Sequence, residues 1–120
     1  MKDLAPHILR QRMVMEGFYS IDVNRTTVES YLRGLADHLD LRTYAEPVVY
    51  SPASGVGRVE NQGFDGFVPL IDSGISVYVW TGDRFFSVVV YTCKRFSETA
   101  ALDFTRTFFQ IEGDIAHLAF

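Results

Sequence analysis

The chain contains one cysteine, Cys93, and a serine, Ser73, that stands beside Gly74 between two runs of strand-forming residues. A single cysteine cannot form an internal disulfide, so Cys93 is either an inert buried thiol or a working one. A serine at a turn is most often only a turn residue. Gly74 is expected to permit unusual backbone torsions there.

Other catalytic chemistries find less support in the sequence. The three histidines, His7, His38 and His117, lie far apart and have no metal-ligand spacing. No serine sits in a nucleophile elbow or a Ser-His-Asp motif. Gly55-Val56-Gly57 lacks the lysine and the third glycine of a phosphate loop, so a surface loop is expected there.

The composition predicts one compact domain over residues 1–120, since 120 residues with 48% apolar content supply one buried core. Ten Phe, six Tyr and one Trp exceed the needs of a small core and favour a stacking surface or a subunit interface. A net charge of −4 without charge runs argues against nucleic acid. No signal peptide or membrane span is evident, so a soluble, cytoplasmic protein is expected.

The first half of the chain predicts a strand, a helix and a second strand. Apolar residues from Arg12 to Ser20 form a run of strand length. Thr26 followed by Glu29 predicts a capping box, and helical spacing after it predicts a helix from Thr27 to about Leu39. The alternation from Leu41 to Tyr50 predicts the second strand.

The second half predicts a turn-rich loop, three strands, a helix and a final strand. In chain order these are Ser51–Gly66, Phe67–Ile71, Ile75–Trp80, Phe85–Thr92, Glu98–Gln110 and Ile115–Phe120. Ser97 is the expected N-cap of the helix and Gly113 its expected stop. Read coarsely, the order is β-α-β, then a hairpin of two strands, then α-β, which gives β-α-β-β-β-α-β. This predicts an α+β two-layer sandwich, a mainly antiparallel sheet with two helices on one face.

The stretch from Gly63 to Cys93 resembles the self-cleaving segment of bacterial-type S-adenosylmethionine decarboxylase proenzymes. The family pattern runs roughly Gly-Val-Ser-Gly, then Glu-Ser-His, then Ile-His-Thr-Trp, and later Phe-Thr-Cys. Its two glycines, serine, tryptophan and cysteine correspond without a gap to Gly63, Gly66, Ser73, Trp80 and Cys93. The resemblance extends to the predicted first strand and helix, and the Ser51–Asn61 loop fits worst.

The resemblance implies a chemical role for each matched residue. Ser73 would attack the carbonyl of Asp72, the chain would cleave between them, and a pyruvoyl group derived from Ser73 would serve as cofactor. That group acts as an electron sink for decarboxylation, the task that pyridoxal phosphate performs elsewhere. Cys93 would return a proton to the substrate as general acid. The family also implies a homodimer that pairs through its sheets, with the aromatic surplus in agreement.

The sequence departs from the family pattern near the cleavage serine. Tyr78 replaces the histidine that accepts a proton during elimination, Asp65 replaces a serine that assists processing, and Gly74 replaces the histidine after Ser73. A tyrosine with a pKa near ~10 is a poor base at neutral pH. Asp65 would substitute as that base if it reaches the site.

Three functions follow as alternatives. The first is a pyruvoyl-dependent lyase that decarboxylates S-adenosylmethionine for spermidine synthesis, with Phe18, Phe64 or Phe67 stacking on adenine and Glu16 or Asp65 meeting the sulfonium charge. The second keeps the mechanism and changes the substrate to another amino acid, as the change at Asp65 suggests. The third is an unprocessed paralogue, suggested by Tyr78 and Gly74, that binds a ligand or a partner subunit.

Overall fold

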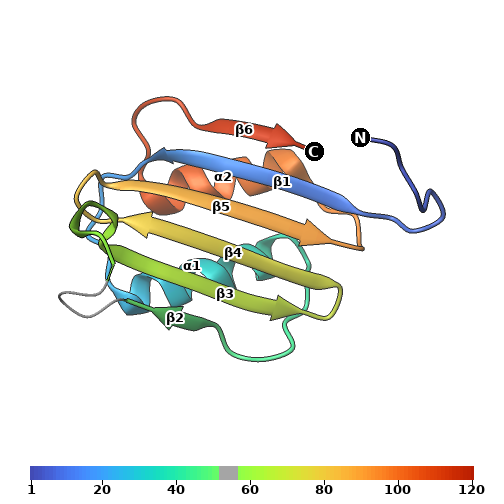
Figure 1. The fold of residues 1–120 in the computed structure, drawn as a ribbon, viewed down its shortest axis with the longest axis horizontal. Coiled ribbons are helices and arrows are strands. Elements are labelled where there is room, and N and C mark those ends of the chain that lie inside the picture. Colours follow the sequence, from blue (N-terminus) through green and yellow to red (C-terminus); the bar gives the residue numbers. More distant parts are fainter. Residues whose placement is uncertain (52–56) are drawn as a thin grey trace.

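The computed structural model describes residues 1–51 and 57–120 and contains one six-stranded antiparallel sheet with two helices on one face (Figure 1). The sheet order is β2-β3-β4-β5-β1-β6, and every neighbouring pair is antiparallel. In chain order the elements are β1 (Gln11–Phe18), α1 (Arg25–His38), β2 (Val48–Tyr50), the 3-10 turn η1 (Val59–Asn61), β3 (Gly63–Leu70), β4 (Ser73–Trp80), β5 (Phe85–Thr92), α2 (Glu98–Phe109) and β6 (Ala116–Ala119). The predicted two-layer α+β class is confirmed.

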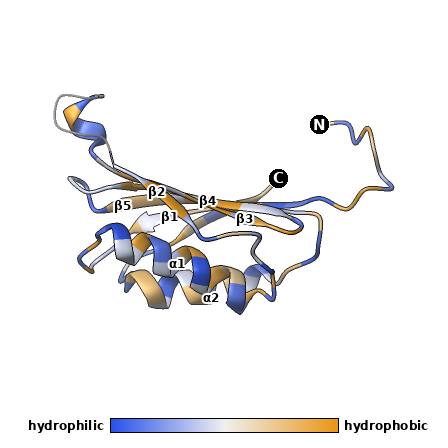
Figure 2. Cartoon of the chain, turned by 90° about the horizontal axis from the view of Figure 1, so that it is seen from below, coloured by the Kyte–Doolittle hydropathy of each residue, from blue (hydrophilic) through white to orange (hydrophobic). Residues whose placement is uncertain are grey.

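Both helices pack on the same face of the sheet, and the opposite face is left uncovered (Figure 2). Residues of the strands alternate between the two faces. Those facing the helices are almost fully buried, among them Met13, Ile75, Val77, Phe86 and Val88. The uncovered side, here called the open face, carries the intervening residues of each strand.

The predicted run Phe67–Ile71 lies, except for Ile71, in β3, which the coarse order did not count, so four strands rather than three separate the two helices. The predicted loop Ser51–Gly66 was wrong at its end, because β3 already begins at Gly63. A Cβ at Gly63 would lie 1.7 Å from the carbonyl oxygen of Val79. This glycine therefore allows β3 to approach β4 closely and does not form a turn. Residues 52–56 of that loop, including Gly55-Val56, lie outside the described residues, and Val59–Asn61 forms the turn η1.

Helix α1 confirms the predicted first helix but not its cap. The capping box is formed by Asn24 and Thr27: the Asn24 side chain accepts from the Thr27 backbone N–H, and the Thr27 hydroxyl accepts from that of Asn24. The predicted box at Thr26 and Glu29 was wrong by two residues. An Asn side chain reaches the N3 backbone as well as Thr does, so the sequence offers competing starts.

The predicted strand Leu41–Tyr50 was wrong in extent, since β2 contains only Val48–Tyr50. The preceding segment instead runs beside the tip of the β3–β4 hairpin. Thr43 makes an isolated bridge with Leu70, and the Ile71 N–H donates to the carbonyl of Arg42 at 2.9 Å. This segment therefore braces the hairpin instead of extending the sheet.

Helix α2 confirms its predicted N-cap, because the Ser97 side chain accepts from the backbone N–H of Ala100. Its predicted end near Gln110 is confirmed, because Gln110 is the C-cap and lies in the left-handed region with φ of 49°. The expected stop at Gly113 was wrong, since the helix has already ended three residues before it. The tail confirms a final strand as β6, which pairs with β1. Within the described residues, no helix is long and apolar enough to cross a bilayer.

Candidate active site

Ser73 and Cys93 meet at the end of the sheet where β4 begins and β5 has just ended. The Ser73 Oγ and the Cys93 Sγ lie 3.6 Å apart, within hydrogen-bond distance for sulfur. Ser73 is half-buried and Cys93 is exposed. The pairing of Ser73 with Thr92 fixes this contact, since Cys93 follows Thr92 directly. The thiol is thus a neighbour of the hydroxyl and not part of the core.

The backbone at Ser73 is strained. Its φ of 135° lies in a region that side chains rarely adopt, and the strain falls at the residue that carries the hydroxyl. The torsional freedom predicted for Gly74 is not used, because Gly74 is not among the residues with positive φ. Gly74 instead provides space: a Cβ there would lie 2.6 Å from the ring of Phe67.

The carbonyl group of Asp72 is held by the backbone of Cys93. The Cys93 N–H donates to the Asp72 carbonyl oxygen at 2.8 Å. This donor withdraws electron density from the carbonyl and stabilises negative charge that develops on its oxygen. The peptide bond between Asp72 and Ser73 is therefore polarised from one side and carries a hydroxyl on the next residue.

Asp65 and Tyr78 lie directly opposite each other on the open face. They belong to a polar row that crosses the sheet, with Tyr50 beyond Asp65, Ser87 beyond Tyr78, and then Glu16. Tyr78 is five residues along β4 from Ser73, which corresponds to about 17 Å at the rise of a strand. Within one chain, the structure does not bring this row to Ser73.

The aromatic residues considered for adenine stacking lie in different places. Phe67 is on the open face, 40% exposed, with its ring over Gly74. Phe18 is also on the open face but at the opposite end, where its ring contacts Phe85, which in turn contacts Trp80. Phe64 lies on the other side of the sheet, packed against the core. Only Phe67 is near Ser73 of the same chain.

Two contributors to the site were missed in the sequence. The Cys93 N–H belongs to the backbone, and no residue type signals it. Ser87 is 9% exposed in the middle of the polar row, between Tyr78 and Glu16. Correct strand registers would have placed Ser87 there, since its position in β5 lies opposite Tyr78.

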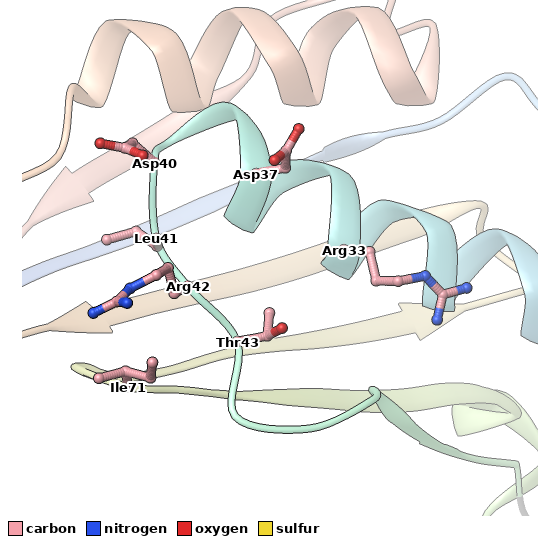
Figure 3. A pocket seen from close by; sticks show the side chains of 7 residues that line it. All are labelled: Arg33, Asp37, Asp40, Leu41, Arg42, Thr43 and Ile71. Carbon is pink, nitrogen blue, oxygen red and sulfur yellow. The ribbon is translucent and has the colours of Figure 1, made fainter.

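A cavity of about 510 Å³ adjoins the hairpin tip on the helix side of the sheet (Figure 3). It is lined by Arg33, Asp37, Asp40, Leu41, Arg42, Thr43 and Ile71. Ion pairs engage two of its charged groups, Arg33 with Glu46 at 2.6 Å and Asp40 with Lys94 at 3.6 Å. Neither Ser73 nor Cys93 lines this cavity.

Comparison with known proteins places this geometry in context. The model of the S-adenosylmethionine decarboxylase family matches residues 18–116. A solved structure, the adenosylmethionine decarboxylase from Aquifex aeolicus VF5, superimposes with a TM-score of 0.72 at 22% identity, covering 94% of this chain and 89% of that one. That likeness concerns the fold. A search of curated proteins gave no significant match.

Proposed function

Because the chain belongs to the S-adenosylmethionine decarboxylase family, we propose that it cleaves itself between Asp72 and Ser73 and then decarboxylates S-adenosylmethionine for spermidine synthesis. The single observation that carries the proposal is the arrangement at one peptide bond. The strained Ser73 presents its hydroxyl beside the Cys93 thiol, and the Cys93 N–H holds the carbonyl that the hydroxyl must attack.

The first step exchanges an amide for an ester. The Ser73 Oγ bonds to the carbonyl carbon of Asp72, its proton leaves, and the bond from that carbon to the Ser73 nitrogen breaks as the nitrogen gains a proton. The Cys93 N–H stabilises the oxygen that becomes negative. Release of the backbone strain at Ser73 favours the shift.

The second step cuts the chain and requires a base. Removal of the Ser73 α-proton expels the Asp72 carboxylate as a leaving group, and water then replaces the nitrogen, which departs as ammonia. Asp65 is the proposed proton acceptor, with Tyr78 directly opposite it in the polar row. Since they lie about 17 Å from Ser73 of their own chain, a second copy must supply them.

A homodimer that pairs through the open faces supplies this second copy. The centre of the open face carries a row of mostly apolar side chains, which a face-to-face partner would bury. Across the sheet these are Leu118, Val14, Val89, Ser76, Phe67 and Val48. Three of the six are at least 40% exposed in the single chain, namely Leu118, Val48 and Phe67.

The residues around Ser73 fit the cofactor that the cleavage would leave. A pyruvoyl group at position 73 supplies an electron sink when formed. Gly74 leaves room beside it, and the Cys93 Sγ lies within reach of position 73 to return a proton to the substrate carbon. Glu16 and Asp65 are proposed to face the sulfonium charge, and Phe67 or Phe18 the adenine ring. Phe64 is not proposed, because it faces the core.

Mass spectrometry of the denatured protein tests the proposal most directly. Two fragments that divide between Asp72 and Ser73 are expected, while a Ser73→Ala variant stays intact. Carbon dioxide release is then measured with S-adenosylmethionine and with a panel of amino acids. One intact mass for the unmodified chain would overturn the proposal and favour an unprocessed binding protein. Cleavage followed by release from another amino acid alone would change the substrate only.

A further inference from the structure

The segment Met1–Arg10, here called the N-terminal arm, precedes the part of the chain that matches the family. It leaves the sheet where β1 begins, at the same end of the sheet as the β3–β4 hairpin, and turns toward the open-face side (Figures 1 and 2). The Asp3 carboxylate accepts from the Ala5 N–H at 2.9 Å and pairs with Arg10, which gives the arm a defined shape. Its apolar side chains are nevertheless exposed, with Leu4 at 85%, Ile8 at 47% and Leu9 at 36%.

The proposed dimer fixes where the arm must go. Placing Ser73 over Tyr78 of the partner subunit requires a two-fold axis that crosses the strands between these two rows. Gln11 lies in the row of Ser73, and Glu16 lies in the row of Tyr78. The same axis therefore sets Gln11 against Glu16 of the partner subunit. Leu9, two residues further out, then faces Phe18 of the partner subunit.

The surfaces that meet in this way are complementary. Phe18 is 64% exposed and forms, with Trp80 and Phe85, an aromatic cluster at the far end of the open face. Leu9 and Ile8 offer the apolar side chains to cover it.

Charge agrees with this placement. Lys2, Arg10 and Arg12 outnumber Asp3, which pairs with Arg10, so the arm and its root keep a net positive charge. Glu16 lies in β1 two residues before Phe18 and pairs with Ala116 of β6. Asp114 lies two residues before Ala116, near the row of Phe18. Opposite charges that face each other across an interface guide association and fix its register.

We infer that the N-terminal arm reaches across the two-fold axis and packs its apolar side chains on the aromatic cluster of a second copy of this chain. The inference rests on the proposed shared site for the orientation of the two copies. Packed sheets cross at about 30°, and this angle displaces the arm sideways from Phe18 toward the next strand. The contact therefore includes Phe85, whose ring lies against that of Phe18.

Cysteine crosslinking in the full chain tests the contact, with Cys93→Ala in every variant so that only introduced thiols react. The test variants pair Leu9→Cys with Phe18→Cys or with Phe85→Cys. Facing sheets lie about 10 Å apart, which exceeds the roughly 7 Å between Cα atoms that a disulfide spans, so a short bis-maleimide is used to link the introduced thiols. At least one pair is expected to form covalent dimers about tenfold faster than the single variants. The Leu9→Cys variant alone should form no covalent dimer, since the axis places Leu9 about 30 Å along the strand from Leu9 of the partner subunit.

Ser76→Cys is the matched control, because position 76 lies next to the axis and should link to its own mate without the arm. Sedimentation of each variant reports the dimer independently. If Ser76→Cys links while both pairs with Leu9→Cys do not, the arm contact is overturned and the proposed dimer stands. If every variant sediments as a monomer and Ser76→Cys fails to link, the dimer itself is wrong, and the arm contact falls with it.

Discussion

At the scale of single residues, Ser73 combines a nucleophilic hydroxyl with a backbone torsion that stores strain. The identity of this residue and of Cys93 could be predicted from type and spacing alone. The hydrogen bond from the Cys93 backbone to Asp72 could not, because every residue except proline carries the same N–H group. Nor could spacing show that Asp65 and Tyr78 face each other far from Ser73, since that depends on strand register.

Replacement of Tyr78 by histidine is expected to accelerate self-cleavage. An imidazole with a pKa near ~6.5 accepts a proton at neutral pH, whereas a phenol near ~10 does not. A positioned general base contributes about 100-fold or more to a rate. The fraction of cleaved chain, followed by mass spectrometry at pH 7.5 over time, measures the gain. Tyr78→Phe is the matched control, and equal rates for the histidine and phenylalanine variants would contradict this role.

Tyr31 predicts a dependence of stability on alkaline pH. Its side chain is fully buried between the helices and the sheet, and burial raises its pKa above the ordinary 10.0, while the hydrogen bond with Thr105 acts in the opposite direction. The unfolded chain therefore ionises at a lower pH than the folded one. Stability from this group is present below about pH 10 and is lost as the pH rises above it.

Tyr31→Phe tests this dependence. At pH 7 the variant should lose about 1–2 kcal/mol of unfolding free energy, because the buried Thr105 hydroxyl loses its partner. Above pH 10 its stability should fall less steeply than that of the unmodified chain. Urea unfolding between pH 7 and 11 measures both effects. Tyr44→Phe, at a side chain that is 72% exposed, serves as the control. Parallel curves for the Tyr31 variant and the unmodified chain would refute the assignment.

At the scale of secondary structure, the regular pattern of apolar residues predicted α1, α2, β1, β4, β5 and β6 close to their observed positions. Glycine caused the main error. Gly63 and Gly66 were interpreted as turn residues, but both lie inside β3, where the missing side chain permits close packing. The sequence cannot distinguish these two uses of glycine, because the first is local and the second depends on what packs against the strand.

Gly66→Ala should weaken the contact between α1 and the sheet. A Cβ at this position would lie 2.8 Å from Val28 and 3.0 Å from Leu32, both buried in α1. Overpacking of this kind costs about 1–3 kcal/mol of unfolding free energy. Chemical denaturation measures the loss. Gly82→Ala is the control, since no atom lies within 4 Å of its added Cβ, and its effect should stay within about 0.5 kcal/mol. An equal effect for both substitutions would contradict the packing argument.

At the scale of the whole molecule, a shared site predicts complementation between two defective chains. One variant carries Ser73→Ala, and the other carries Asp65→Asn with Tyr78→Phe. Neither should cleave alone, because each homodimer lacks one half of every site. When the two are unfolded and refolded together, hybrid dimers join Ser73 of the second variant to Asp65 and Tyr78 of the first. Cleavage of the second variant alone is then expected by mass spectrometry.

The complementation result has two informative failures. Cleavage of the doubly substituted variant by itself would show that Asp65 and Tyr78 are not needed. An intact mixture in which hybrid dimers are present would show that each chain relies on its own residues. The unmodified chain, cleaved under the same refolding conditions, provides the reference.

The sheet order gives chain cleavage a further consequence. A cut after Asp72 would leave β1, β2 and β3 on one fragment and β4, β5 and β6 on the other, yet β1 lies between β5 and β6. Strands of the two fragments therefore alternate within one sheet, and the fragments cannot separate unless the hydrogen bonds of β1 with β5 and β6 break. Formation of this sheet from the cleaved form becomes bimolecular and slows on dilution, whereas the intact precursor forms its sheet within one chain at a rate independent of concentration. Folding before cleavage therefore lets one chain form the whole sheet, whereas the two fragments could form it again only by associating with each other.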